Sequence, residues 1–363
     1  MADDAYTPYH GWMHYGPRID KLKPSFSYQE IGERLGGLTK DQVRRYWRDW
    51  KRNRTNPPTS GAPLPTIDGH GVSDEMYIDE DRVWREALRL TRRQQDRQER
   101  KASNALRFPS GPIGLVFLAD LHLGSPGVDY QRLDDDITAI LDTPGLYVVA
   151  VGDMLDNFII GRLKDIRISG APFAVCEEWA LARRVLRRLA PRLVGSVSGN
   201  HDLWTYAVSG IDYLAEIHAA LTPGILYDKF NLMFDLHVAD TVVPFRVRHA
   251  WTGSSIYNPT HGIERAAKFD KGEVFTVGVG AHTHRSGVAR EFNNGGETGI
   301  AILCGSYKVS DNFADMLGLP KANESAAVTV LVDEFGNIDA TNNLAWASRI
   351  LKSLYPGQLV HDG

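Results

Sequence analysis

Short apolar runs recur through the middle of the chain, and each ends at a polar residue. The runs cover residues 113–119, 146–151, 193–198, 242–247 and 275–281. Apolar runs of about four to eight residues bounded by turn residues are typical of strands covered on both faces. Apolar residues at helical spacing predict helices between and after them, at residues 130–141, 177–189, 212–221 and 344–354. Strands that alternate with helices predict an α/β fold.

Acidic and histidine side chains follow these predicted strands. They are Asp120 and His122, Asp153, Asn200 and His201, His249, and His282 and His284. Open α/β folds place their sites at the carboxyl ends of strands, so we expect these side chains to converge on one sheet edge. Mixed carboxylate and imidazole ligands suit divalent transition metals. The pattern therefore predicts a metal site.

The number and kind of these ligands favour a pair of ions. Two divalent ions about 3.5–4 Å apart supply a nucleophilic hydroxide at neutral pH and positive charge on phosphoryl oxygens, which phosphoester hydrolysis requires. A bridging carboxylate reduces the repulsion between such ions, and Asp153 is our candidate for the bridge. A single Asp-x-His fragment is weak evidence, because an N-capped turn after a strand looks the same. Five fragments in one chain are stronger evidence.

Together the fragments resemble the calcineurin-like metallophosphoesterase superfamily over residues 107–336. That family's pattern is D-x-H, G-D-x-x-D, G-N-H-(D/E), a histidine after a strand, and G-x-H-x-H, and each block is present here. The resemblance implies a four-layer β-sandwich flanked by helices, and residues 299–304 and 326–332 fit its second sheet. It implies that Asp120, His122, Asp153 and His284 hold one ion and that Asp153, Asn200, His249 and His282 hold the other. The expected ions are Mn²⁺, with Fe, Zn, Ni or Mg as alternatives.

The resemblance also indicates the proton donor. His201 follows the ligand Asn200 but is not assigned to a metal, so we expect it to protonate the leaving oxygen. Asp156 has the position that orients this histidine in the family, although it alternatively caps the segment that follows it. Asp202 is expected to bind the backbone of its own loop.

The N-terminal part of the chain has a different composition. The whole chain has 363 residues and a net charge of −4, yet residues 1–105 have an excess of three basic residues. Residues 40–54 alone contain seven basic residues against two acidic ones. Ser27 and Glu30 form a predicted capping box, and Thr39 is a predicted cap for a second helix over residues 40–52. These two short helices resemble the helix-turn-helix of bacterial and phage regulators, with a turn lengthened by two glycines.

This resemblance implies that the second helix binds DNA. The side chains expected at a groove or its phosphates are Lys40, Gln42, Arg44, Arg45 and Arg48. The alternative is a solvated basic helix whose aromatic residues close a small core. Residues 57–71, rich in proline and glycine, predict an extended linker, and residues 81–101 predict a helix with a basic end.

These patterns divide the chain into four parts. We expect a small all-α helix-turn-helix domain at residues 1–56, a linker and basic helix at 57–105, a catalytic domain at 106–342, and a C-terminal helix and tail at 343–363. Cys176 and Cys304 are far apart, which argues against a disulfide framework. No apolar stretch approaches the ~20 residues of a membrane span, so we expect a cytoplasmic protein without membrane contact, with a homodimer left open.

The substrate is the open question. Arg162, Lys164 and Arg167, and the segment 251–265 with His261, are candidates for substrate contacts, with structural salt bridges as the alternative for the basic residues. Asn157 and Ser198 stand where the phosphoprotein phosphatase branch has arginines, which argues against that branch. The first hypothesis is a DNA phosphodiesterase, a nuclease. The second is a small-molecule phosphodiesterase or phosphatase with a regulatory or protein-binding N-terminal domain. A regulator with an inactive domain is disfavoured because every ligand position is filled.

Overall fold

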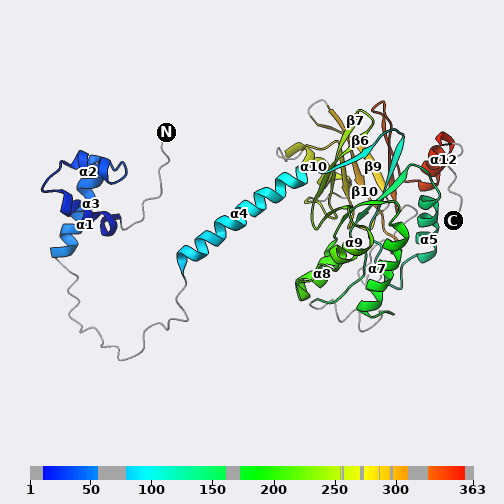
Figure 1. Cartoon of the computed structure of the whole chain (residues 1–363), viewed down its shortest axis with the longest axis horizontal. Coiled ribbons are helices and arrows are strands. Elements are labelled where there is room, and N and C mark those ends of the chain that lie inside the picture. Colours follow the sequence, from blue (N-terminus) through cyan, green and yellow to red (C-terminus); the bar gives the residue numbers. More distant parts are fainter. Residues whose placement is uncertain are drawn as a thin grey trace. The chain divides into compact units, whose positions relative to one another are not determined.

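The chain folds into two compact units, Met1–Asp79 and Glu80–Gly363. The computed structural model describes residues 11–55, 79–160, 172–253, 255, 257–269, 274–285, 287–294, 297–309 and 326–355 (Figure 1). The predicted linker at residues 57–71 and the candidate contacts Arg162, Lys164 and Arg167 lie outside the described residues.

The first unit consists of three described helices, α1 (Gly11–Leu22), α2 (Tyr28–Arg34) and α3 (Lys40–Thr55). The predicted capping box is confirmed, since the Ser27 amide donates to Glu30 Oε2 at 2.8 Å and the Glu30 amide donates to Ser27 Oγ at 3.4 Å. Thr39 caps α3 in the same way. Its Oγ1 accepts from the Gln42 amide at 3.3 Å, and its own amide donates to Gln42 Oε1 at 2.8 Å. These caps satisfy amides that a helix start leaves without partners.

A small apolar core joins these helices. Ile19, Ile31 and Val43 are fully buried, one from each helix. Trp47 packs at the edge of this core, and its Nε1 donates to Asp20 Oδ1 at 3.1 Å. The apolar side of α3 is therefore turned inward.

Two six-stranded sheets form the second unit. One has the order β12 (Ile338–Thr341), β11 (Val328–Val332), β2 (Ile113–Leu118), β3 (Leu146–Val151), β4 (Leu193–Val197) and β5 (Leu226–Asp228). The other has the order β1 (Ala105–Phe108), β6 (Leu232–Val238), β7 (Thr241–Val247), β8 (Val277–Gly280), β10 (Glu297–Leu303) and β9 (Val288–Asn294). The strands β2, β3, β4 and β5 run parallel, as do β7, β8 and β10.

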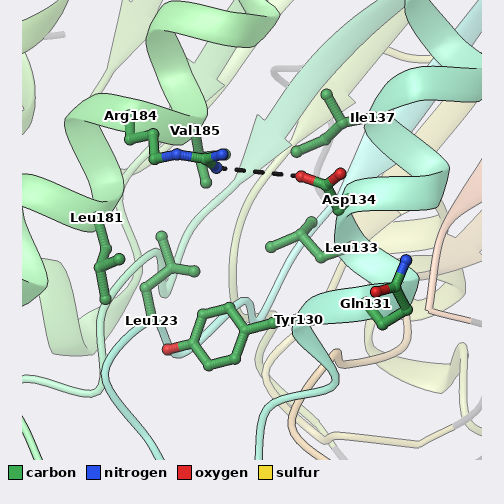
Figure 2. A pocket seen from close by; sticks show the side chains of 9 residues that line it. All are labelled: Leu123, Tyr130, Gln131, Leu133, Asp134, Ile137, Leu181, Arg184 and Val185. Atoms are coloured by element: carbon green, nitrogen blue, oxygen red, sulfur yellow. Dashed lines mark ion pairs between the residues drawn. The ribbon is translucent and has the colours of Figure 1, made fainter.

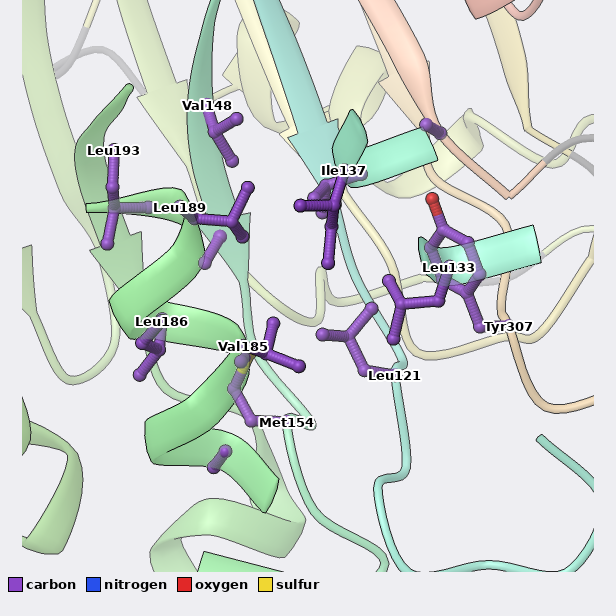
Figure 3. Close-up of a cluster of buried hydrophobic side chains, with 14 of the residues drawn as sticks. Leu121, Leu133, Ile137, Val148, Met154, Val185, Leu186, Leu189, Leu193 and Tyr307 are labelled. Atoms are coloured by element: carbon purple, nitrogen blue, oxygen red, sulfur yellow. The ribbon is translucent and has the colours of Figure 1, made fainter. Parts of the chain in front are cut away.

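Helices cover the outer faces of the two sheets. The helices that cover them are α5 (Tyr130–Leu141), α7 (Val175–Leu189), α9 (Tyr213–Leu221), α10 (His261–Phe269) and α12 (Leu344–Leu354). This unit also contains α8 (Asn200–Ser209) and α4 (Glu80–Ala102), and α4 is exposed over residues 80–96. One apolar core lies between the sheets and includes Phe117, Phe234 and Phe245. A second core lies between the β2 sheet and α5, α7 and α12 (Figure 3). The α10 helix packs on β8 and β10, which completes four layers.

Two expectations about the sheets are wrong. Residues 326–332 do not belong to a second sheet, because β11 pairs antiparallel with β2 in the sheet that carries Asp120. The candidate ligands do not converge on the edge of one sheet either, since β2, β3 and β4 belong to one sheet and β7 and β8 to the other. The hydrophobic pattern of the sequence predicts where a strand lies, but it does not predict which strands pair with it. None of the described helices is long and apolar enough to cross a membrane.

Candidate metal centre

Five of the seven predicted ligands lie on turns after strands, in an uncommon backbone conformation. Asp120, His122, Asp153, His282 and His284 have positive φ angles between 46° and 73°. Residues other than glycine rarely adopt these angles, and such strain is found mainly where function requires it. Outside this set, Asn157 and Ala239 are the other non-glycine residues with positive φ in the described part of the chain.

Main-chain hydrogen bonds fix the first two turns against each other. The Asp120 amide donates to the Gly152 carbonyl at 3.1 Å, and the His122 amide donates to the Asp153 carbonyl at 3.0 Å. Gly152 itself has a φ of +82°, and a Cβ at this position would lie 2.8 Å from His249 Nδ1 and closer still to the Gly199 amide. Only glycine allows the backbone to approach so closely.

One group of ligand atoms comes from Asp120, His122 and His284. The Nε2 atoms of His122 and His284 are 2.8 Å apart, and His284 Nε2 lies 3.5 Å from Asp120 Oδ1. The second carboxylate oxygen of Asp120 accepts from the His282 amide at 2.8 Å, which joins the turns of the two sheets. This group combines residues that we expected to hold one ion.

A second group comes from Asp153, His249 and His282. His249 Nε2 lies 3.1 Å from Asp153 Oδ2, and its Nδ1 lies 2.7 Å from the Val151 carbonyl. A protonated Nδ1 that donates to this carbonyl leaves Nε2 available as a ligand. Asp153 Oδ2 also lies 3.9 Å from His122 Nε2 in the first group, so Asp153 stands between the groups. Its predicted role as a bridge stays a prediction.

Buried atoms without hydrogen bonds show that this centre fits cations. Among the described residues, Asp120 Oδ1, Asn200 Oδ1 and His249 Nε2 are buried and make no hydrogen bond, although His249 Nε2 lies 3.1 Å from Asp153 Oδ2 and Asp120 Oδ1 lies 3.5 Å from His284 Nε2. Buried polar atoms of this kind are rare, because each costs about 1–3 kcal/mol. Divalent ions bound there would take a lone pair from each of these three atoms. The donor set of imidazole, carboxylate and amide oxygen matches transition metals such as Mn²⁺ or Zn²⁺.

The carboxylates and imidazoles shift one another's pKa values. Burial alone would raise the pKa of Asp120, but the imidazoles of His122 and His284 offset it and hold that pKa well below its usual range. Burial alone would lower the pKa of His249, yet the Asp153 carboxylate raises it to about 10. Burial likewise opposes protonation of His122, and Asp120 and Asp156 raise its pKa to about 9. The positive charge of protonated His122 and His249 would thus balance the negative charge of the carboxylates.

The candidate proton donor His201 lies beside this centre at the start of α8. Its Nε2 is 3.9 Å from Asp153 Oδ2, and its amide donates to Asp153 Oδ1 at 2.9 Å. Its Nδ1 lies 2.5 Å from the main-chain carbonyl of Asp156, rather than bonding to the carboxylate. The predicted contact between His201 and Asp156 therefore exists but runs through the backbone. Burial lowers the pKa of His201 to about 4.

The Asp156 carboxylate has partners that the sequence did not reveal. Its Oδ1 lies 3.2 Å from His122 Nδ1 and accepts from Lys308 Nζ at 2.8 Å. Burial opposes ionisation of Asp156, but His122 and Lys308 lower its pKa to about 2. Lys308 lies 152 positions away in the sequence. Its only sequence signal was a basic residue after a predicted strand.

Asp202 joins two ligand turns. Its carboxylate accepts from the Gly199 amide at 2.9 Å, as expected for its own loop, and also from the Met154 amide at 3.0 Å. The Asn200 turn and the Asp153 turn are thereby held together. Burial, with the nearby Asp153 charge, raises the pKa of Asp202 to about 7.

The other candidate contacts are less closely connected to the centre. His261 is exposed and begins α10, and Ser255 Oγ accepts from the amides of Tyr257 and Asn258 within its own turn. A hollow between α5 and α7 starts at Leu123, next to the ligand His122 (Figure 2). There the Tyr130 hydroxyl accepts from the Gly124 amide at 2.8 Å and anchors the turn after His122.

The candidate DNA contacts lie on α3. Lys40, Arg44, Arg45 and Arg48 are exposed, and Gln42 is half-buried with its Oε1 accepting from the Thr39 amide. A shallow hollow on this surface is lined by Asp41, Gln42, Arg44, Arg45 and Arg48. The helix thus presents arginines on one side and packs Val43 and Tyr46 into the core on the other.

Comparisons with known proteins give fold likenesses only. No family model and no curated protein matches this sequence. Vps29 of Chaetomium thermophilum is 11% identical, with 63% of this chain and 96% of that chain covered and a TM-score of 0.32. The calcineurin-like phosphoesterase YfkN of Bacillus subtilis is 9% identical, with 68% and 96% covered and a TM-score of 0.34. The nuclease MPE of Pseudomonas putida is 13% identical, with 62% and 87% covered and a TM-score of 0.28. With likeness this low, the function must be argued from the residues of this chain.

Proposed function

We propose that this protein is a metal-dependent phosphodiesterase that cleaves DNA. The observation that carries the proposal is the convergence of Asp120, Asp153 and His249 from two sheets, with His249 Nε2 3.1 Å from Asp153 Oδ2 and 3.9 Å from Asp120 Oδ1. Asp120 Oδ1 and Asn200 Oδ1 are in addition buried without a hydrogen bond to any described residue. Such atoms cost stability unless cations bind them. A pair of divalent ions bound there would supply an activated water and positive charge for the phosphoryl oxygens.

We assign separate roles in the reaction to Asp153, His201 and His122. Asp153 lies between both ligand groups and keeps its charge, because the cationic imidazoles around it hold its pKa below its usual range despite burial. His201 has its Nδ1 against the Asp156 carbonyl, so its Nε2 is the nitrogen that would exchange a proton with the leaving oxygen. Because the pKa of His201 is about 4 without substrate, the negative charge of the bound phosphodiester must raise that pKa so that Nε2 carries the proton. His122 is oriented by the Asp156 carboxylate.

DNA as substrate is supported by the first unit. The arginines Arg44, Arg45 and Arg48 are accessible along α3, as phosphate contacts must be. A basic helix beside a capped short helix is the arrangement that a helix-turn-helix uses to enter the major groove. We therefore assign DNA binding to this unit and phosphodiester cleavage to the other.

The test is hydrolysis of an aryl phosphodiester and of single- and double-stranded DNA with Mn²⁺. We expect turnover that a chelator abolishes, and Asp153→Asn to lower the rate roughly 100-fold or more, because ligand networks of this kind tolerate little change. Asp339→Asn removes an exposed carboxylate from β12 and should leave the rate unchanged.

Each outcome separates the hypotheses. Full turnover of wild type in chelator, or of Asp153→Asn, would contradict the metal-dependent mechanism. Turnover of the aryl ester without cleavage of either DNA would leave the small-molecule phosphodiesterase with a regulatory N-terminal domain.

A further inference from the structure

Lys308 is a charged side chain in the interior of the second unit. Its side chain is 8% exposed, and its Nζ lies 2.8 Å from Asp156 Oδ1. Removing an ammonium group from water costs several kcal/mol, so a buried lysine persists only with a close partner. Asp156 is a partner of equal and opposite charge, and it is buried to the same degree.

The same carboxylate oxygen serves a predicted metal ligand. Asp156 Oδ1 lies 3.2 Å from His122 Nδ1, while His122 Nε2 points to the ligand group of His284. A carboxylate behind a ligating histidine fixes the ring and increases its electron donation. Lys308 shares this oxygen and therefore withdraws part of its charge.

The backbone of Lys308 is attached to the first ligand turn. Ser306 Oγ and the Tyr307 amide both donate to the Asp120 carbonyl, at 2.8 and 3.2 Å. The Lys308 amide donates to Ser306 Oγ at 3.0 Å, and the Val309 amide donates to the Gly127 carbonyl at 2.8 Å. Hydrogen bonds to the main chain of the Asp120 turn thus hold the segment that carries Lys308.

We propose that Lys308 is a positioning residue that acts through Asp156 and cancels its charge. Asp156 can then orient His122 without adding net negative charge to the centre. This inference rests on the proposed function, since it assumes that the centre holds two divalent ions. With Lys308, the carboxylates Asp120, Asp153 and Asp156 contribute a net charge of minus two instead of minus three, so the loaded centre keeps more positive charge for a phosphate anion.

The charge role and a purely structural role predict opposite signs. If Lys308 cancels charge, Lys308→Met should bind Mn²⁺ roughly 3- to 10-fold more tightly in the absence of substrate, because a nearby positive charge has been removed. The same variant should bind inorganic phosphate more weakly by a similar factor. If Lys308 only supports packing, its loss should weaken Mn²⁺ binding instead.

The experiment titrates metal-free protein with Mn²⁺ by calorimetry and the Mn²⁺-loaded protein with inorganic phosphate. Lys308→Arg keeps the charge and should restore both affinities toward wild type. Lys229→Met is the control, because Lys229 forms an ion pair with Asp212 at 3.2 Å in the same unit, outside the metal centre. It should change neither affinity.

A double variant guards against misfolding. In Asp156→Asn with Lys308→Met the pair is neutral again, so we expect this variant to bind Mn²⁺ more tightly than Asp156→Asn alone, which leaves the Lys308 charge without its carboxylate. Lys308→Met that binds Mn²⁺ no more tightly than wild type overturns the inference. So does a double variant that binds Mn²⁺ no more tightly than Asp156→Asn alone. Absence of Mn²⁺ binding by wild type would instead overturn the proposed function.

Discussion

At the scale of single residues, the carboxylates of the candidate metal centre favour protons on the imidazoles beside them. Against the opposing effect of burial, Asp153 raises the pKa of His249 to about 10, and Asp120 and Asp156 raise the pKa of His122 to about 9. Both imidazoles are therefore protonated at neutral pH in metal-free protein. A metal ligand must be unprotonated, so cations and protons compete for these nitrogens.

This competition predicts a pH dependence of metal binding. The bound proton must leave before the metal binds, so Mn²⁺ affinity should rise with pH between about 6 and 9, with proton release at neutral pH. Calorimetric titration at pH 7 in two buffers of different ionisation enthalpy measures the number of protons released. Heats that are independent of the buffer would contradict the protonated state of His122 and His249.

The proposed role of His201 predicts that the effect of its substitution on the rate depends on the leaving group of the ester. We expect His201→Ala to lower the rate on DNA or alkyl esters by roughly 100- to 10,000-fold, since general acids contribute this much. The rate on p-nitrophenyl esters should fall much less, because that leaving group departs without a proton. Metal content, measured by mass spectrometry after dialysis, should stay that of wild type, and a loss of metal would mean that His201 is a ligand.

Residue identities were predictable where motif spacing is short, and not where contacts are long-range. The turns with Asp120 and His122, and with Asn200 and His201, were found because their residues are neighbours in sequence. The pair of Lys308 with Asp156 spans 152 positions and has no local pattern. The role of Gln42 was also missed, since its side chain caps α3 at Thr39 in addition to any contact with DNA.

At the scale of elements, hydrophobic runs predicted strand positions closely but left pairing open. The run at residues 146–151 became β3 with the same bounds, and residues 130–141 became α5. The helix α8 was not expected, because it begins directly at Asn200 and has little amphipathic pattern of its own. Sheet membership depends on contacts between distant strands, which explains why β11 was assigned to the wrong sheet.

The close approach of turns predicts a strict requirement for glycine between β3 and Asp153. Gly152→Ala places a methyl group against the Gly199 amide and His249 Nδ1, so we expect a loss of metal and of roughly 2 kcal/mol or more of stability. Gly210→Ala is the matched control, because Gly210 has a similar φ of +72° but open space around it. It should cost about 1 kcal/mol and leave metal content unchanged. Thermal unfolding and metal analysis measure both; equal effects of the two variants would show that φ, not contact, matters.

At the scale of the whole molecule, the two units have separate tasks in our proposal. The catalytic unit contains its own cores and all the candidate ligands, and the first unit has a core of its own around Ile31 and Val43. Each unit buries its own apolar residues, so a change on the surface of one need not disturb the other. DNA binding and chemistry can therefore be tested separately.

The final prediction tests this separation. Replacing Arg44, Arg45 and Arg48 by Ala should weaken DNA binding steeply and lower its salt dependence, by roughly 0.9 counterions for each phosphate that α3 no longer binds. Aryl phosphodiester turnover should be unchanged, because these side chains belong to α3 and not to the metal centre. Fluorescence anisotropy over a range of salt concentrations measures the first effect, and a colorimetric assay measures the second.

A control of equal charge makes the comparison specific. Arg183, Arg187 and Arg349 are exposed on α7 and α12 of the catalytic unit, and replacing them by Ala removes the same three positive charges. If α3 is the DNA-binding surface, this control should keep most of the affinity and the salt slope of wild type. Equal losses in both triple variants would mean that net charge alone attracts DNA. Unchanged affinity in the α3 variant would remove the main reason for naming DNA as the substrate, and would favour a small phosphodiester.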